Sequence, residues 1–385
     1  MEHRHQAPGL SAFLQFNIGH PQLEAVLART LTVSQSQSKP EIIVITGPTG
    51  VGKTTLADRL EREVSARYAD QMDRDRGMIP VVHIAVTTPG TSGFNWKDFY
   101  TRLLHQIDAV NPQLKLPICP SDFDMFASTY DIPRALPNTS TLERHFETAV
   151  KHRKVKMLIL DEANQMLVGC HAAELQRRFE ALKSLSLNTG VTIVLVGTYD
   201  LLQIRDQSAQ LVRRSEIIHF PRYQCEDDKD RYQFGSVLKT FAEQMPFSRP
   251  PDLTSRVMEF YLLSVGCIGI LKRWLNQAVE DAVRRGIDTP DADFFLDRAQ
   301  CKHSAQTILT EASIGERRLV DIPLSVLQSQ SQAQFLALKE MAVNVADLGK
   351  RMGRASQKRK VAERIAKRDP VGRTYDADQE EFDFA

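Results

Sequence analysis

The chain has few cysteines and no long apolar run. Its five cysteines are odd in number, scattered and never spaced as Cys-x-x-Cys, which excludes a disulfide framework and a cysteine-based zinc site. We expect all of them to be reduced structural thiols: Cys119, Cys170, Cys225, Cys267 and Cys301. No apolar run approaches the roughly 20 residues that a membrane helix needs. The first residues also lack the apolar segment of a signal peptide, so we expect a cytoplasmic protein without membrane contact.

Strong net charge is also absent, since the formal charge is +1 over 385 residues, a length that allows two or three domains. The charges are nevertheless unevenly placed. Residues 350–368 are basic, with only Glu363 opposing them, and acidic residues follow as far as Asp383. We expect this tail to be largely disordered on its own, and its tip, Glu381-Phe382-Asp383-Phe384, is similar to a short docking peptide.

Short apolar runs alternate with helical patterns as far as about residue 220. This alternation predicts a parallel α/β sheet. An amphipathic helix is expected over 20–33, well placed to cover a nucleotide base, and the prolines between 89 and 137 indicate an insertion of loops and short helices. The five strands are expected at 42–45, 81–86, 157–160, 191–196 and 217–220.

Beyond residue 225 the pattern is helical only, with helices expected over 232–242, 255–264 and 268–283. After about residue 303 apolar periodicity weakens. We therefore predict four regions: an N-terminal segment and linker (1–38), an α/β core (39–224), a small all-helical lid (225–302) and a flexible C-terminal region with the basic run and acidic tip (303–385).

A phosphate-binding loop follows the first predicted strand and precedes a helix-forming stretch. Glycines let the backbone close around an anion, so that successive N–H groups and the positive end of the next helix face the phosphates. Lys53 would reach the β- and γ-phosphates, the Thr54 hydroxyl would ligate Mg²⁺, and Thr55 would support the loop. We expect ATP or GTP with Mg²⁺ to bind at Gly47, Pro48, Thr49, Gly50, Val51, Gly52, Lys53, Thr54 and Thr55.

Two carboxylates end the third predicted strand. Asp161 would hold Mg²⁺ through water, and Glu162, pointing elsewhere, would polarise the attacking water as a general base. A nucleotide kinase has no need of the second acid, whereas a hydrolase does. The pair therefore favours a nucleotide hydrolase.

The next predicted strand ends at Thr198, which would lie beside the two acids if neighbouring strands align. Two roles fit this residue: sensing the γ-phosphate or orienting the water, and capping a helix or turn. Arg213 and Arg214, before the fifth strand, also allow two interpretations. They are suited to reach a neighbouring subunit's γ-phosphate, or they are solvated or ion-paired surface residues.

The order of phosphate loop, Asp-Glu strand, sensor strand, arginine pair and helical lid resembles the AAA+ ATPases over residues from about 20 to 300. Within that class the chain resembles the TnsC/TniB group of transposition regulators. The motifs that carry this second resemblance are His20-Pro21, Gly47-Pro48-Thr49-Gly50-Val51-Gly52-Lys53-Thr54-Thr55, Leu160-Asp161-Glu162-Ala163, Val196-Gly197-Thr198 and Gly266-Cys267-Ile268-Gly269-Ile270-Leu271.

The resemblance implies a DNA-dependent ATPase that assembles with itself on double-stranded DNA as a ring or helical filament, with hydrolysis as a timer. Such regulators link a TniQ-type targeting protein, sometimes attached to an RNA-guided CRISPR complex, to a transposase. Backbone contacts to DNA need few side chains per subunit, and Thr91, Lys97 and Arg102 are candidates. The basic run 350–368 is expected to bind DNA or an acidic partner.

Two positions depart from the family pattern. The sensor strand ends in Gly197-Thr198 where many relatives carry asparagine, and the second departure is in the lid. Many AAA+ lids present an arginine to the nucleotide, but Gly269 occupies that place here, and Lys272 or Arg273 either substitutes or lies on the helix surface. Two other functions stay open. One is a helicase loader or replication-initiation ATPase, although no winged-helix region is recognisable after residue 300. The other is a nucleotide-switch scaffold that does not bind DNA.

Overall fold

The computed structural model describes residues 9–36, 40–88, 93–110, 138–207, 215–321, 323–326 and 329. The chain divides into a unit Met1–Leu319 and a unit Val320–Ala385. The basic run 350–368 and the acidic tip lie outside the described residues, so the predicted properties of the tail stay predictions.

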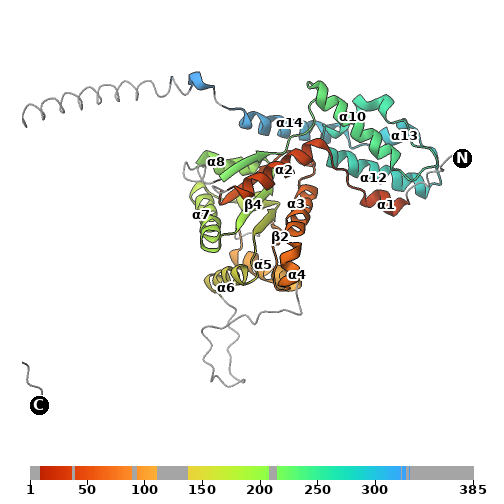
Figure 1. The fold of residues 1–385 in the computed structure, drawn as a ribbon. Coiled ribbons are helices and arrows are strands. Elements are labelled where there is room, and N and C mark those ends of the chain that lie inside the picture. The colour runs from red at the N-terminus through yellow and green to blue at the C-terminus, as the bar shows by residue number, and fades with distance from the viewer. Residues whose placement is uncertain are drawn as a thin grey trace, which may run out of the picture. The chain divides into compact units, whose positions relative to one another are not determined.

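A five-stranded, all-parallel sheet forms the centre of the α/β core (Figure 1). Its order is β2-β3-β4-β1-β5, and all five predicted strands are confirmed. Because Thr46 pairs with Gly197 and Ala85 with Asp161, the carboxyl ends of neighbouring strands share one edge of the sheet. The strands are β1 (Ile42–Thr46), β2 (Val81–Ala85), β3 (Met157–Asp161), β4 (Thr192–Gly197) and β5 (Ser215–His219).

Helices cover both faces of this sheet, as continuous apolar strands require. Every residue of β1, β3 and β4 is buried. Alternate strand residues pack in two separate clusters, one with α2 and α3 and the other with α5, α6 and α7, so that the sheet lies between α3 and α7 in Figure 1. These helices are α2 (Pro21–Gln35), α3 (Lys53–Arg67), α5 (Trp96–Val110), α6 (Thr139–His152) and α7 (Ala172–Thr189).

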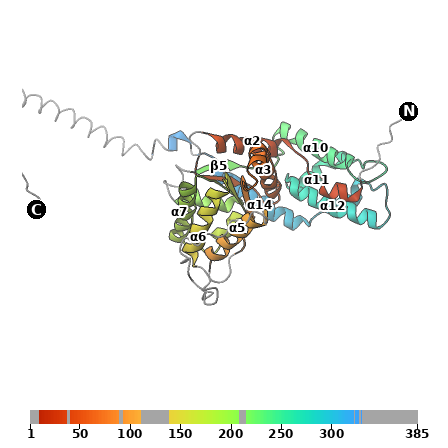
Figure 2. The same cartoon turned by 60° about the horizontal axis from the view of Figure 1, so that its bottom comes forward.

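A third apolar cluster forms the helical lid. Its helices are α10 (Asp228–Glu243), α11 (Val257–Ser264), α12 (Ile268–Arg284) and α13 (Ala292–Leu296), which matches the three helices predicted there and adds a short fourth. The N-terminal helix α1 (Leu10–Gln15) lies beside α12, as Figures 1 and 2 show, and its Phe13 is fully buried in this cluster. Part of the predicted N-terminal segment therefore belongs to the lid.

A long helix, α14 (Lys302–Leu319), occupies the start of the region that we predicted to be flexible from residue 303. Sequence periodicity missed it because the residues that it buries are small: Ala305, Ala312 and Gly315. Glu316 accepts hydrogen bonds from Arg222 Nε at 2.9 Å and from Gln224 Nε2 at 3.1 Å, which fixes α14 to the segment after β5.

The remaining elements are short: α4 (Ala69–Arg74), α8 (Gln203–Gln207) and the 3₁₀ helices η2 (Ala163–Leu167), η3 (Tyr199–Leu202) and η4 (Thr254–Arg256). In the described part of the predicted insertion, α5 is longer than the short helices expected there, and α6 follows the last of its prolines. Among the described residues, no single helix has the length and apolar character to cross a membrane; α11 with η4 and α12 meets that test only as a pair bent by 115°.

Candidate nucleotide site

The phosphate loop connects β1 to α3, and its glycines are required by backbone geometry. Gly50 and Gly52 have φ of 77° and 115°, in the left-handed region that glycine adopts without steric cost. At Gly47, a Cβ atom would lie only 2.3 Å from the carbonyl oxygen of Phe220. The sequence predicted the glycines for access to phosphates, and the structure shows that the fold needs them as well.

Lys53 lies over this loop with its amine held by backbone oxygens. Nζ donates to the Gly47 carbonyl at 3.1 Å and to the Pro48 carbonyl at 2.8 Å, and the residue is 9% exposed. Burial lowers the pKa of Lys53, while the negative charges of Glu162 and Asp161 act in the opposite direction. The loop lysine and the two acids of β3 therefore share one electrostatic environment, as a phosphate site with a metal ion needs.

The two predicted acids differ in their surroundings. Asp161 is the last residue of β3 and is 3% exposed, and its Oδ1 accepts a hydrogen bond from the Glu162 backbone N–H at 2.8 Å. Glu162 is exposed and has φ of 52°, an uncommon conformation for a residue with a Cβ. Such backbone strain recurs at functional sites, and here it coincides with the change from a buried to an exposed carboxylate.

Thr198 lies where the sequence predicted, because β4 separates β1 from β3 in the sheet. Its carbonyl accepts from Thr46 Oγ1 at 2.9 Å, and its own hydroxyl donates to Asp200 Oδ2 at 3.0 Å. Thr198 directly precedes η3, but its side chain does not cap that helix. Its hydroxyl bonds within the local turn instead. Phosphate sensing by Thr198 stays a prediction.

Asn164 is a polar residue at this edge that our sequence analysis missed. Its Oδ1 is buried without a hydrogen-bond partner within the described structure, and a Cβ at Gly197 would lie 2.8 Å from it. A buried carbonyl oxygen without a partner is costly, which is typical of a group that acquires one from a ligand or water. The feature of the sequence that could have identified Asn164 is its position two residues after the Asp-Glu pair.

These residues fit ATP with Mg²⁺. Thr54 is exposed in the first turn of α3, where the helix contributes its positive end. A hydroxyl and a carboxylate, from Thr54 and Asp161, are the hard oxygen ligands that Mg²⁺ prefers. Lys53 and the loop backbone would hold the phosphates, and Glu162 is the exposed carboxylate available to accept a proton from water.

The lid meets the phosphate loop through backbone atoms. Ile270 N, in the first turn of α12, donates to the Gly50 carbonyl at 3.1 Å. A Cβ at Gly269 would lie 2.5 Å from the same oxygen, so that only glycine permits this approach. The position where many relatives carry an arginine is thus occupied by a close contact between backbones.

Lys272 was predicted to contact the nucleotide, but its amine contacts α1 instead. Its Nζ donates to the Phe13 carbonyl at 2.6 Å and lies 3.7 Å from the centre of the Phe13 ring, and burial lowers its pKa to about 8. The amine is engaged between α12 and α1 because a lysine at this position of α12 faces the lid interior. Arg273, the other candidate, is exposed on α12.

Of the predicted DNA contacts and the arginines predicted to reach a neighbouring subunit, only Arg102 and Lys97 are among the described residues. Arg102 is exposed on α5, and its Nε pairs with Asp98 Oδ2 at 2.7 Å, one turn earlier, so that part of its charge is already compensated. Lys97 is partly buried on the same helix. Thr91, Arg213 and Arg214 lie outside the described residues, and their roles stay predictions.

His20, part of the predicted His-Pro signature, is 3% exposed before α2. Its Nδ1 lies 3.1 Å from Tyr223 Oη, and its ring stacks at 6.1 Å on Phe220, the residue that contacts Gly47. Burial lowers the pKa of His20 to about 4, so the imidazole is neutral near pH 7. The segment before β1 is thereby fixed next to the phosphate loop.

Comparisons with known proteins agree with this fold. Residues 36–204 match the family model described as an AAA domain. The match and the phosphate loop within it are typical of domains that bind and hydrolyse nucleotides. Comparison with curated proteins gave no match.

Several solved structures resemble this chain at low identity. The ORC2 protein of Aeropyrum pernix, solved as ADPNP-ADP complexes, is 16% identical, with 74% of this chain and 70% of that chain covered and a TM-score of 0.46. Cdc6p from Pyrobaculum aerophilum is 14% identical, with coverages of 73% and 68% and a TM-score of 0.46. A Walker-type ATPase of Pyrococcus abyssi is 13% identical, with coverages of 83% and 81% and the same score. At these scores and identities the likenesses carry no argument about fold, substrates or partners.

Proposed function

We propose that this protein is an ATPase that assembles on double-stranded DNA and regulates DNA transposition, with hydrolysis controlling disassembly. The observation that supports hydrolysis is the arrangement at one sheet edge of a buried lysine, a buried aspartate and an exposed glutamate: Lys53, Asp161 and Glu162. In this arrangement Lys53 would compensate phosphate charge, Asp161 would hold Mg²⁺, and Glu162 would accept the proton of the attacking water.

The proposed role in transposition rests on the resemblance to the TnsC/TniB group. Its partners would be a transposase and a TniQ-type targeting protein, with or without an RNA-guided CRISPR complex. In such an assembly Arg213 or Arg214 would complete the site of a neighbouring subunit, because a planar guanidinium stabilises charge on the transferred phosphoryl group. DNA would be held through its phosphates, with Lys97 and Thr91 as candidate contacts.

The test is ATP hydrolysis measured with and without duplex DNA, together with electron microscopy in a non-hydrolysable ATP analogue. We expect DNA to stimulate hydrolysis, and rings or filaments to form only when nucleotide and DNA are both present. Lys53→Ala should abolish both signals, and Glu162→Gln should form long-lived oligomers on DNA.

The same experiments separate the alternatives. Hydrolysis that DNA does not change, with monomers under every condition, would favour the nucleotide-switch scaffold. Assembly on DNA without any effect on strand transfer by a candidate partner transposase would instead favour a helicase loader or replication-initiation ATPase.

A further inference from the structure

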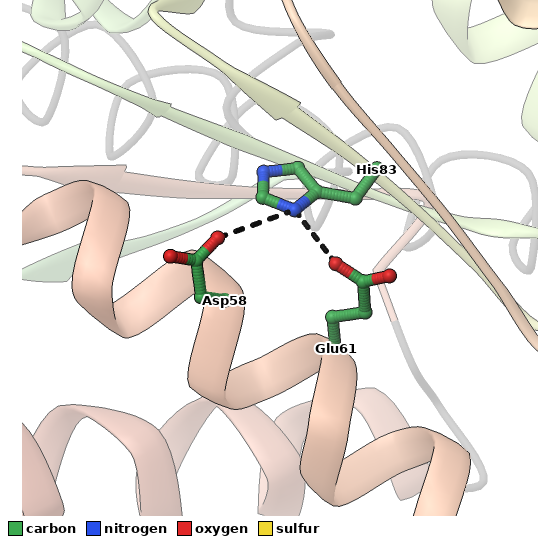
Figure 3. Close-up of side chains that lie close together, drawn as sticks. All are labelled: Asp58, Glu61 and His83. Carbon is green, nitrogen blue, oxygen red and sulfur yellow. Dashed lines mark hydrogen bonds and ion pairs between the residues drawn. The ribbon is translucent and has the colours of Figure 1, made fainter. Parts of the chain in front are cut away.

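Three side chains of types that commonly bind metal ions lie close together beside the sheet, outside the nucleotide site. Asp58 and Glu61 are three residues apart on α3, and His83 is on β2, whose neighbour in the sheet is β3 (Figure 3). His83 Nδ1 lies 2.9 Å from Glu61 Oε2 and 3.7 Å from Asp58 Oδ1. The three atoms all lie within 4.8 Å of one another.

An ion pair between His83 and one carboxylate does not satisfy the second carboxylate. A ring nitrogen donates one hydrogen, and the distance to Glu61 is that of a hydrogen bond, whereas the distance to Asp58 is too long for one. Within the described ranges, neither carboxylate pairs with a lysine or arginine. Two carboxylates therefore face one imidazole, and their mutual repulsion is only partly compensated.

A divalent ion would satisfy all three groups. Ligand atoms around a tetrahedral zinc ion lie about 3.3 Å apart, since Zn–N and Zn–O bonds are about 2.0–2.2 Å. The side chains of Asp58 and Glu61 are 57% and 39% exposed, so both can rotate toward a common ion, and water can fill its open position. The His83 side chain is 14% exposed and supplies the fixed ligand.

We propose that Asp58, Glu61 and His83 bind a divalent transition-metal ion of the zinc class, separately from the Mg²⁺ of the nucleotide site. The imidazole nitrogen selects this class, because Mg²⁺ and Ca²⁺ prefer oxygen ligands alone. Such an ion joins α3, which begins at Lys53, to β2, whose Ala85 pairs with Asp161. It therefore stiffens the support of the phosphate loop.

The experiment is calorimetric titration of the full-length, nucleotide-free protein with zinc chloride at pH 7.5. Wild type is compared with His83→Gln, Asp58→Asn and Glu61→Gln, and with His105→Gln on α5 as a matched control, whose histidine is exposed. We expect His83→Gln to lose about one equivalent of zinc, each carboxylate variant to bind it at least about 10-fold more weakly, and the control to match wild type. Zinc bound elsewhere, for example by His3 and His5, is common to all five proteins and cancels.

A second measurement is the melting temperature with and without zinc, and with millimolar Mg²⁺ as competitor. Zinc should raise the melting temperature of wild type and of His105→Gln more than that of the three site variants, and Mg²⁺ should not displace it. Equal zinc stoichiometry and affinity in wild type and in the two carboxylate variants would overturn the proposal and leave an ion pair only. Because Asp58 and Glu61 are on the surface, these variants decide the matter even if His83→Gln folds poorly.

Discussion

Replacing Gly269 by alanine tests the contact between the lid and the phosphate loop. The added Cβ would lie 2.5 Å from the Gly50 oxygen, 3.2 Å from the Gly50 carbonyl carbon and 3.4 Å from Gly52 N. Because all three atoms belong to the backbone, α12 must move away. Overpacking of this kind costs about 1–3 kcal/mol, and loss of the Ile270 N–H to Gly50 hydrogen bond adds about 1 kcal/mol.

Gly235, within α10, supplies the matched control. A Cβ there would meet only Val257 Cγ2, at 3.9 Å, an ordinary contact. Gly235→Ala should therefore stabilise the protein by about 0.5–1 kcal/mol, since alanine has the higher helix propensity. The higher helix propensity of alanine also applies at Gly269, so the net destabilisation expected for Gly269→Ala is about 1–3 kcal/mol.

The assays are urea unfolding and steady-state ATP hydrolysis. A net cost of about 2 kcal/mol shifts the equilibrium between docked and undocked lid about 30-fold toward the undocked state. We expect Gly269→Ala to lower the unfolding midpoint and to slow hydrolysis, with Gly235→Ala unchanged or improved in both. If Gly269→Ala were as stable as Gly235→Ala and hydrolysed ATP at the wild-type rate, the contact between α12 and Gly50 would contribute neither to stability nor to hydrolysis.

Three further variants test other parts of the structure. Glu162→Gln should retain ATP affinity but lose about 10²–10⁴-fold in turnover, because a positioned general base contributes about that much; a normal turnover number would remove Glu162 from this role. Glu316→Gln should destabilise the protein by about 3 kcal/mol in urea unfolding, since it leaves Arg222, 7% exposed, without its counter-charge; an unchanged midpoint would show that α14 is held by packing alone. His20 has a folded pKa of about 4, below the ordinary 6.5, so it contributes stability above pH 6.5 that is lost as pH falls toward 4, by about 3 kcal/mol in total. Burial lowers the pKa of His83, but its bond to Glu61 and the nearby carboxylates outweigh burial and raise it, so His83 makes stability fall rather than rise with pH. The measurement is therefore the difference in the pH dependence of stability between wild type and His20→Gln. This difference should vanish if His20 were exposed in the native state.

The positions of the residues in the candidate nucleotide site were largely predictable because their signals are local. The loop Gly47–Thr54 and the pair Asp161-Glu162 each follow an apolar strand, and parallel strands bring such ends to one edge. Thr198 was placed correctly for the same reason. What the sequence did not contain was the partner of each side chain: the Thr198 hydroxyl bonds Asp200, and Lys272 bonds Phe13, 259 residues away.

The other misses have a common physical cause, since small or polar residues make contacts that leave no apolar periodicity. α14 packs with Gly315 against Tyr199, where a Cβ would come within 2.0 Å of the tyrosine ring. The cluster of Asp58, Glu61 and His83 required knowledge that α3 lies over β2. Neither proximity is encoded by spacing along the chain.

The structure suggests how the lid communicates with the phosphate site without an arginine. Gly269 permits α12 to approach Gly50, and α14 extends from α11 to Tyr199, which directly follows Thr198. Glu316 fixes the same helix to Arg222, itself within 3.5 Å of the Val265 carbonyl before α12. Displacement of the lid would therefore act on the phosphate loop through α12 and on the end of β4 through α14. The first connection is a backbone hydrogen bond and the second uses side chains of α14, so we infer that the lid responds to the position of the loop rather than to phosphate charge.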